Sequence, residues 1–356
     1  MNSIAVVSMD IHKRFSKAVA MSAEGEIVEE GRIAHGDHRL MQAYFSRFAP
    51  GTPVVMEATF NWPWVADLAE DSGLDPHLAH PPRLREYAKG LAKTDRKDAI
   101  FQGKLWLAKE VFPESYRAPA AVRQMRALFR LRLLWVRMRT MMKNNVHGQL
   151  LKLGLVLSQE ATDLFSLKGR QVLAGLELKD EDRAELERKL SVIDSLSEHI
   201  QELDGEINAV LKQDEHAAIL MSLPGIGQQI AYAILAEVGE FSRFPNGRAL
   251  ASYAGLLPVP RQSGGRERER RTTSGCNRFL KWAFLEAVSG ATRSSRHFKS
   301  LHARVRARNR QRPGKARVAV ARELAELAHL LVTRDVRYEE RPMMPKHKQR
   351  TQSQTR

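Results

Sequence analysis

A long apolar stripe in the middle of the chain limits the folds that are open to it. Between residues 181 and 211, leucine, isoleucine and valine recur in steps of three and four beneath a glutamate-rich exterior, which is the spacing of one face of a helix. Two successive steps of three break a strict heptad, so the pattern predicts either a coiled coil or a long helical hairpin. The stripe consists of Leu186, Leu190, Ile193, Leu196, Ile200, Leu203, Ile207 and Val210.

A second long helix, basic rather than acidic, is predicted over residues 118–152. Apolar residues recur there at helical spacing with arginines and lysines between them. We expect Arg130, Arg137 and Lys143 to contact nucleic acid. The alternative is a core-packing helix whose cations are only solvated.

The sequence before these helices predicts a mixed α/β domain over residues 1–117. An apolar run at 4–9 and the stretches "SKAVAMSA" and "EIVEEGRIAH" are typical of a strand meander. Helices near 37–48 and 62–73 then alternate with the strand-like "TPVVMEAT" and "LDPHLAHP".

The sequence after the helices predicts a mostly helical domain over residues 216–335, which leaves 118–215 as a helical linker. In "LPGIG", Gly225 and Gly227 form a Gly-x-Gly turn typical of a helix-hairpin-helix, whose backbone amides can bind a DNA phosphate. An ordinary helix connection is the alternative. Residues 336–356 are polar and basic, and a disordered tail is expected there.

Charge favours a polyanionic partner. The net charge is +16, which points to nucleic acid or an acidic membrane surface. No apolar run reaches the roughly 18 residues of a membrane span, and the N-terminus does not resemble a signal peptide, so a cytoplasmic protein is expected. The single cysteine, Cys276, excludes an internal disulfide and a cysteine metal cluster. The sequence contains no phosphate-binding P-loop and no dinucleotide fingerprint, which disfavours ATP-driven and NAD-dependent enzymes.

Four acids are candidates for a metal site. Asp10 and Glu57 each end a predicted strand. Asp95 and Asp98 lie three residues apart on a predicted helix, which makes them neighbours. Carboxylates gathered in this way favour Mg²⁺. Solvated or helix-capping acids are the alternative. The cations beside them, expected to receive phosphates, are Lys93, Arg96 and Lys97.

A serine in "RQSGGRERERR" is a candidate nucleophile. Neighbouring cations could help the hydroxyl of Ser263 attack phosphorus and form a phosphoserine. A flexible Ser-Gly-Gly loop is the alternative. Ser274, farther along, is expected to cap the next helix. The arginines expected to bind nucleic acid around the serine are Arg261, Arg266, Arg268, Arg270 and Arg271.

Five motifs in order resemble the DEDD-type insertion-sequence transposases, a family related to Piv DNA invertases and bridge-RNA-guided recombinases. They are "SMDIHK", "VVMEAT", "KTDRKDA", "LPGIG" and "YAGLLPVPRQSGG", and the resemblance runs from about residue 4 to about 330.

The resemblance implies a RuvC-like domain with a ribonuclease-H-like sheet, a coiled-coil linker and a transposase domain. It places the metal-binding acids on Asp10, Glu57, Asp95 and Asp98 and the nucleophile on Ser263. It also implies Mg²⁺, donor and target DNA, a structured bridge RNA, and a homodimer or homotetramer whose subunits share the site, in a prokaryotic, nucleoid-associated protein.

Two further interpretations remain open at this point. In a metal-dependent junction nuclease the four acids would activate water, and Ser263 would be a loop residue. In a non-catalytic scaffold the basic elements would bind phosphate, and the acids would be idle.

Overall fold

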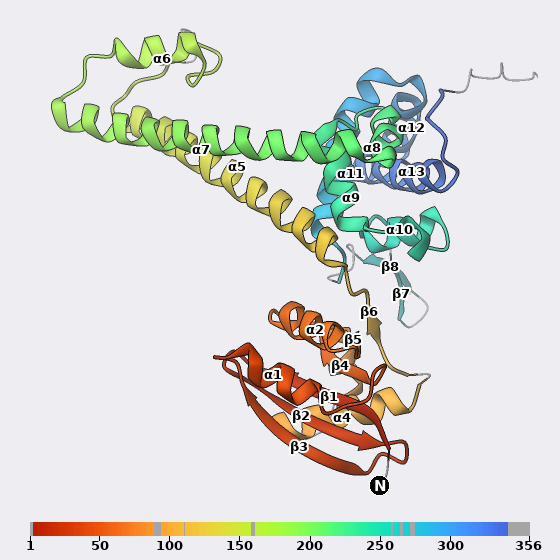
Figure 1. The fold of residues 1–356 in the computed structure, drawn as a ribbon. Coiled ribbons are helices and arrows are strands. Elements are labelled where there is room, and N and C mark those ends of the chain that lie inside the picture. The colour runs from red at the N-terminus through yellow and green to blue at the C-terminus, as the bar shows by residue number, and fades with distance from the viewer. Residues whose placement is uncertain are drawn as a thin grey trace, which may run out of the picture. The chain divides into compact units, whose positions relative to one another are not determined.

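The chain forms two compact units, and the boundary between them in the sequence falls between Ala118 and Pro119. The structure, a computed structural model, describes residues 3–88, 94–109, 111–157, 161–257, 259–263, 266–270 and 275–340, and in 259–263 and 266–270 it describes the backbone alone. Figure 1 shows the elements of both units.

The first unit is built on a mixed sheet with strand order β3-β2-β1-β4-β5-β6. The first three strands form the predicted antiparallel meander, and β4 and β5 run parallel to β1. Central strand β1 is buried on both faces, because helices cover both sides of the sheet. The strands are β1 (Ile4–Ile11), β2 (Phe15–Ser22), β3 (Ile27–Ala34), β4 (Pro53–Glu57), β5 (Asp75–Ala79) and β6 (Glu114–Ser115).

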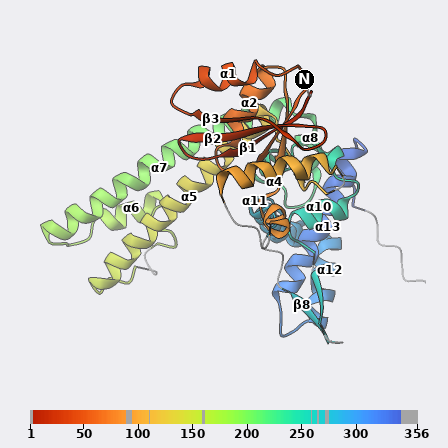
Figure 2. The same cartoon turned by 90° about the horizontal axis from the view of Figure 1, so that it is seen from below.

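Helices cover the two faces of this sheet separately (Figure 2). On one face, α1 (His38–Phe45) and α2 (Trp62–Asp71) bury a cluster that includes Met9, Phe45 and Met56. On the other face, α4 (Asp95–Leu107) packs against β1, β2 and β4. The short α3 (Pro81–Tyr87) follows β5. The predicted α/β domain is thereby confirmed.

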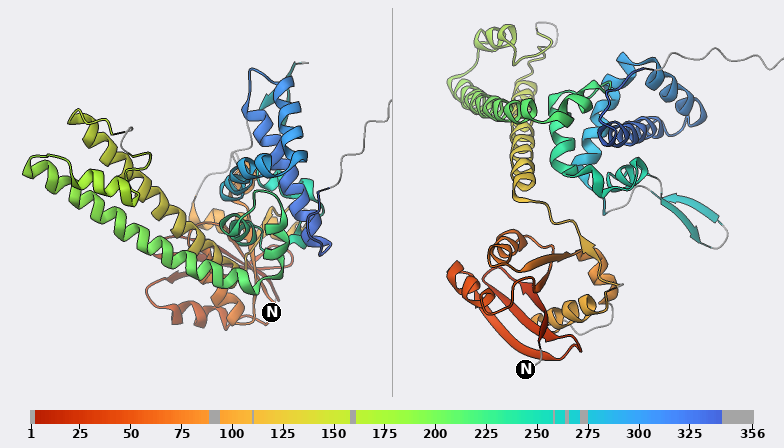
Figure 3. Two further views of the ribbon diagram at one scale, coloured as in Figure 1. Left: turned by 90° about the horizontal axis from the view of Figure 1, so that it is seen from above. Right: turned by 45° about the vertical axis from the view of Figure 1, so that its right-hand side comes forward.

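Two long helices open the second unit and pack along each other (Figure 3). They are α5 (Ala120–Lys152) and α7 (Asp180–Gln213), with α6 (Leu167–Ala174) packed near the loop end of the pair. The predicted stripe over 181–211 thus lies on one long helix that packs against α5 as one arm of a helical hairpin. Coiled-coil pairing with another chain stays a prediction. The break in the heptad explains why Leu190 is only partly buried while Leu186 and Ile193 are buried.

The rest of the second unit is helical around one large core. Leu220, Tyr232, Phe284 and Phe298 are among its fully buried residues. Among the described helices, none combines the length and the apolar character needed to cross a membrane. The remaining elements are α8 (Glu215–Ser222), α9 (Gln228–Val238), η1 (Phe241–Arg243), α10 (Gly247–Tyr253), β7 (Val259–Ser263), β8 (Arg266–Arg270), α11 (Arg278–Ser294), α12 (Arg296–Arg308) and α13 (Gly314–Thr333).

Two boundaries differ from the predictions. Helix α11 is capped by Asn277, whose side chain accepts from two backbone N–H groups, and not by Ser274, which lies outside the described residues. Residues 336–340 do not belong to a loose tail, because the N–H of Tyr338 donates to Ser222 and the carboxylate of Glu340 accepts from Ser295. Residues 341–356 lie outside the described part of the chain.

Candidate active site

The topology of the first unit brings the ends of two strands together. Strands β1 and β4 are parallel neighbours, with Met9 opposite Met56. Asp10 and Glu57 each come one residue later, so they emerge side by side at the same edge of the sheet. Asp10 is largely buried, with 16% of its side chain exposed.

The start of α4 supplies the other two acids. Thr94 caps this helix by accepting a hydrogen bond from the N–H of Lys97 at 3.2 Å. Asp95 and Asp98 fall in the first turn, where the positive end of the helix dipole stabilises negative charge.

His12 connects the strand end to this helix. Its Nε2 lies 3.1 Å from Oδ2 of Asp10 and 3.2 Å from Oδ2 of Asp95. Both distances are in ion-pair range, and this buried nitrogen makes no hydrogen bond of acceptable geometry. A potential ligand atom therefore lies between two carboxylates. The ligand atoms of Asp10, His12 and Asp95 lie within 4.8 Å of one another.

The electrostatics of Asp10 reflect all four acids. Burial raises the pKa of its carboxyl group above the ordinary 3.8, and His12 partly counteracts this. The negative charges of the other acids raise the pKa of Asp10 further, in the order Asp98, Asp95 and Glu57. The predicted acids are thus gathered in one volume that carries excess negative charge. Such an arrangement fits a hard divalent cation with oxygen ligands.

The cations beside the acids differ from one another. Arg96 forms a bidentate contact with Glu30, with Nε 2.8 and 3.0 Å from the two carboxylate oxygens. Hydrogen bonds from Arg96 and from Lys17 lower the pKa of Glu30 to about 2. Lys97 is exposed, and Lys93 lies outside the described residues. Their contact with nucleic acid stays a prediction.

The candidate nucleophile lies in the second unit. Strands β7 and β8 form an antiparallel hairpin in which Ser263, the last residue of β7, pairs with Arg266. This places the serine at the turn of the hairpin. The side chains of Ser263, Arg261, Arg266, Arg268 and Arg270 are not described, and Arg271 lies outside the described residues, so the roles of these residues stay predictions.

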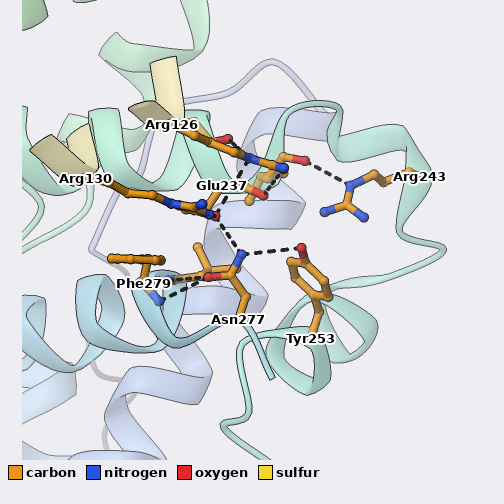
Figure 4. Close-up of polar contacts among 10 residues, drawn as sticks. Arg126, Arg130, Glu237, Arg243, Tyr253, Asn277 and Phe279 are labelled. Atoms are coloured by element: carbon orange, nitrogen blue, oxygen red, sulfur yellow. Dashed lines mark hydrogen bonds and ion pairs between the residues drawn. The ribbon is translucent and has the colours of Figure 1, made fainter. Parts of the chain in front are cut away.

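A buried acid that sequence reasoning missed lies where the ends of α9 and α10 approach the start of α11 (Figure 4). Glu237, near the end of α9, is fully buried and receives both Nε and Nη2 of Arg130 at 3.0 Å. Arg126 donates to the last-turn carbonyl oxygens of Ala236 and Glu237. Two guanidinium groups therefore neutralise a buried carboxylate and the negative end of a helix. An acid within the apolar run "AYAILAEVG" was the available signal.

Asn277 joins this acid to the end of α10. Its Nδ2 donates to Oε2 of Glu237 at 2.8 Å and lies 3.4 Å from the hydroxyl oxygen of Tyr253. Tyr253 ends α10, which precedes the hairpin in the chain, and Asn277 caps α11, which follows it. Asn277 therefore connects the helix before the hairpin to the helix after it.

The other residues that were predicted to contact nucleic acid differ in how far they are engaged within the protein itself. The guanidinium carbon of Arg130 also lies over the ring of Phe279, 4.5 Å from its centroid. Lys143 lies over Phe165, and Arg137 is exposed. Gly225 has a φ of +83° and packs against the backbone of α11. Gly227 is the N-cap of α9, and a β-carbon at this position would meet nothing within 4 Å. None of these observations tests contact with nucleic acid.

Family models match both units. A DEDD-type IS110 transposase model matches residues 7–154, and a model of the IS116/IS110/IS902 transposase family matches residues 217–303. The chain belongs to the IS110 family of transposases. The two matches include every predicted acid and the serine hairpin.

Curated relatives agree with this membership. The transposase for insertion sequence element IS1111A of Coxiella burnetii is 25% identical over 349 residues, covering 95% of this chain and 92% of the relative. The pilin gene-inverting protein of Moraxella bovis is 25% identical over 59% of this chain and 58% of the relative. The IS116 protein of Streptomyces clavuligerus is 39% identical, but the match spans only 24% of its length.

Proposed function

We propose that this chain is the transposase of an insertion sequence, a site-specific recombinase that cuts and rejoins DNA through a phosphoserine at Ser263. The observation that carries the proposal is the convergence of Asp10, Asp95 and His12, with two further acids close enough to raise the pKa of Asp10. The names of the relatives, transposases and a gene-inverting protein, support the same reaction class.

The proposed chemistry divides between the two units. The Ser263 hydroxyl attacks a DNA phosphate, loses its proton, and displaces one sugar oxygen, which leaves as a hydroxyl. Attack by a hydroxyl of another strand then breaks the phosphoserine and restores the serine. Bound Mg²⁺ would supply positive charge for the phosphate oxygens. Asp10, Glu57, Asp95 and Asp98 would hold it, and the Nε2 of His12 would orient Asp10 and Asp95.

Separate observations support the proposed fold details, the guide RNA and the oligomer. A ribonuclease-H-like first unit is supported by the strand order and by the acids at the sheet edge. A helix-hairpin-helix is supported by α8 and α9 flanking the Gly-x-Gly turn. A bridge RNA as guide is supported by family membership and by the +16 net charge. A homodimer or homotetramer that shares the site is supported by family membership alone.

A covalent-capture experiment tests the function. The purified protein is incubated with Mg²⁺, RNA recovered from its own cells and supercoiled DNA carrying the junction of its element, and the products are separated on a denaturing gel. Ser263→Ala and Asp10→Ala are compared with wild type, and Ser252→Ala on α10 serves as a control for loss of a nearby serine. We expect protein-linked DNA from wild type and the control only.

Two outcomes would reject the phosphoserine. Free nicked DNA from both wild type and Ser263→Ala would leave a metal-dependent nuclease. No strand scission with any divalent metal would leave a nucleic-acid-binding scaffold.

A further inference from the structure

One segment of the second unit concentrates positive charge without any acid. Residues 287–322 contain eleven lysines and arginines and no aspartate or glutamate, so this segment contributes +11 where the whole chain has a net charge of +16. The segment comprises the end of α11, all of α12 and the start of α13.

The fold brings many of these cations to one end of a helical pair. Helices α12 and α13 pack on each other and are joined by residues 309–313, so the end of α12 and the start of α13 lie together. We call Arg304, Arg306, Arg308 and Arg310 the arginine tip; all four are exposed. A hollow of about 450 Å³ at this end is lined by residues 307–312 and Lys315. Helix α13 starts there, directly after Pro313.

The arginines of the tip differ from several other arginines of the protein. Arg47, Arg96 and Arg132 each pair with an acid. Within the described residues, the four arginines of the tip have no ion pair or hydrogen bond from their side chains. Arg304 and Arg308 are also four residues apart on α12, a spacing at which like charges destabilise a helix.

A purely structural role explains only part of this surface. Arg306 and Arg308 lie in the last turn of α12, where cations favour the helix dipole. Arg304 precedes that turn and Arg310 follows the helix, so the dipole does not account for them. A polyanion would relieve the repulsion among all four.

We propose that the arginine tip binds the phosphate backbone of double-stranded DNA beside the bond that is cut. The proposal rests on the proposed function, and α11 supplies the geometric link. That helix starts after the serine hairpin and leads directly to α12. Its 17 residues span about 25 Å, and the 13 residues of α12 then lie between the end of α11 and the tip. The tip would therefore contact flanking DNA and not the cleaved bond.

Direct binding measurements test this surface. The variant R304Q/R306Q/R308Q/R310Q is compared with K168Q/K179Q/R188Q/K212Q, which removes the same charge from exposed positions on and beside α6 and α7. Fluorescence anisotropy with a 40-base-pair junction duplex is recorded from 50 to 300 mM KCl. A duplex with only four base pairs beyond the junction and a double-stranded RNA of 40 base pairs are the other probes.

We expect the tip variant to bind the long DNA at least about tenfold more weakly, with a salt slope shallower by about two to four, as for the loss of that number of phosphate contacts. Both variants should bind the short duplex alike. Equal losses in the two variants, or an unchanged salt slope, would overturn the proposal, and a loss confined to RNA would reject DNA as the partner. Circular dichroism establishes that both variants fold. Covalent capture by wild type tests the proposed function separately, because binding requires no cleavage.

Discussion

The backbone N–H of Asn277 donates to the carbonyl oxygen of Tyr253 at 2.9 Å, which closes the base of the segment that carries Ser263. The same asparagine caps α11 and donates to the buried carboxylate of Glu237. One side chain thus connects α9, α10 and α11 at the point where the hairpin leaves the core.

Asn277→Ala is expected to cost more stability than an ordinary lost cap. Loss of a cap costs about 0.5–2 kcal/mol, and a buried carboxylate that loses a donor adds about 1–3 kcal/mol. Asn246→Ala is the matched control, because Asn246 caps α10 through the N–H of Ala249 without contacting a buried acid. Urea unfolding followed by circular dichroism measures both variants. Equal losses would show that the Glu237 contact contributes nothing.

The Glu237–Arg130 pair should show strong coupling in a double-mutant cycle. Glu237→Ala leaves cations facing a buried site and should cost about 3–5 kcal/mol. The double variant Glu237→Ala/Arg130→Ala should lose less free energy of unfolding than the two single variants lose in sum. The expected coupling energy is about 1–3 kcal/mol. The exposed pair Arg47–Glu29 provides the comparison, with an expected coupling below about 1 kcal/mol. Additive losses at Glu237 and Arg130 would contradict this account.

Much of the first unit was predictable because its signals are local. Strand runs, helix periodicity and the acids at the strand ends each depend on a few adjacent residues, as "VVMEAT" and Asp95 with Asp98 illustrate. The sheet then brings Asp10 and Glu57 together, since the ends of parallel neighbours share an edge.

The Glu237 cluster was not predictable in the same way. Its partners come from α5, α9, α10 and α11, which are far apart in the sequence. Arg130 was predicted to contact nucleic acid because an arginine on an amphipathic helix has the same sequence pattern whether its partner is a phosphate or a buried carboxylate. The arginine tip was not predicted, because no sequence motif distinguishes it. Its only signal in the sequence is the absence of acidic residues over 287–322.

Asp10→Asn should stabilise the metal-free protein at neutral pH. The folded pKa of Asp10 is raised above 3.8, so the folded state binds its proton more tightly than the unfolded state does. Stability contributed by this group is then lost as the pH rises from 3.8 through the folded pKa. The variant should consequently gain stability over wild type across that window and keep the gain at higher pH.

Magnesium should make wild type more stable than Asp10→Asn. If the four acids hold the ion, 10 mM Mg²⁺ raises the Tm of wild type by several degrees, as a ligand of the folded state does, and raises that of Asp10→Asn much less. Asp71→Asn, at the exposed end of α2, should respond as wild type does. Differential scanning fluorimetry across pH 4–8 measures the series. An equal response of Asp10→Asn and wild type to Mg²⁺ would remove Asp10 from the metal site.

Alanine substitutions at Gly225 and Gly227 should distinguish a packing role from a phosphate-binding role within the same turn. A β-carbon on Gly225 would lie 2.1 Å from the carbonyl oxygen of Ala287, and the φ of +83° disfavours any side chain, so Gly225→Ala should cost about 3 kcal/mol. A β-carbon on Gly227 meets nothing within 4 Å, so Gly227→Ala should fold with a change below about 1 kcal/mol. If amides at the start of α9 bind a phosphate, the added methyl group should still weaken DNA binding several-fold in anisotropy measurements. Unchanged affinity in Gly227→Ala would leave the turn with a packing role alone.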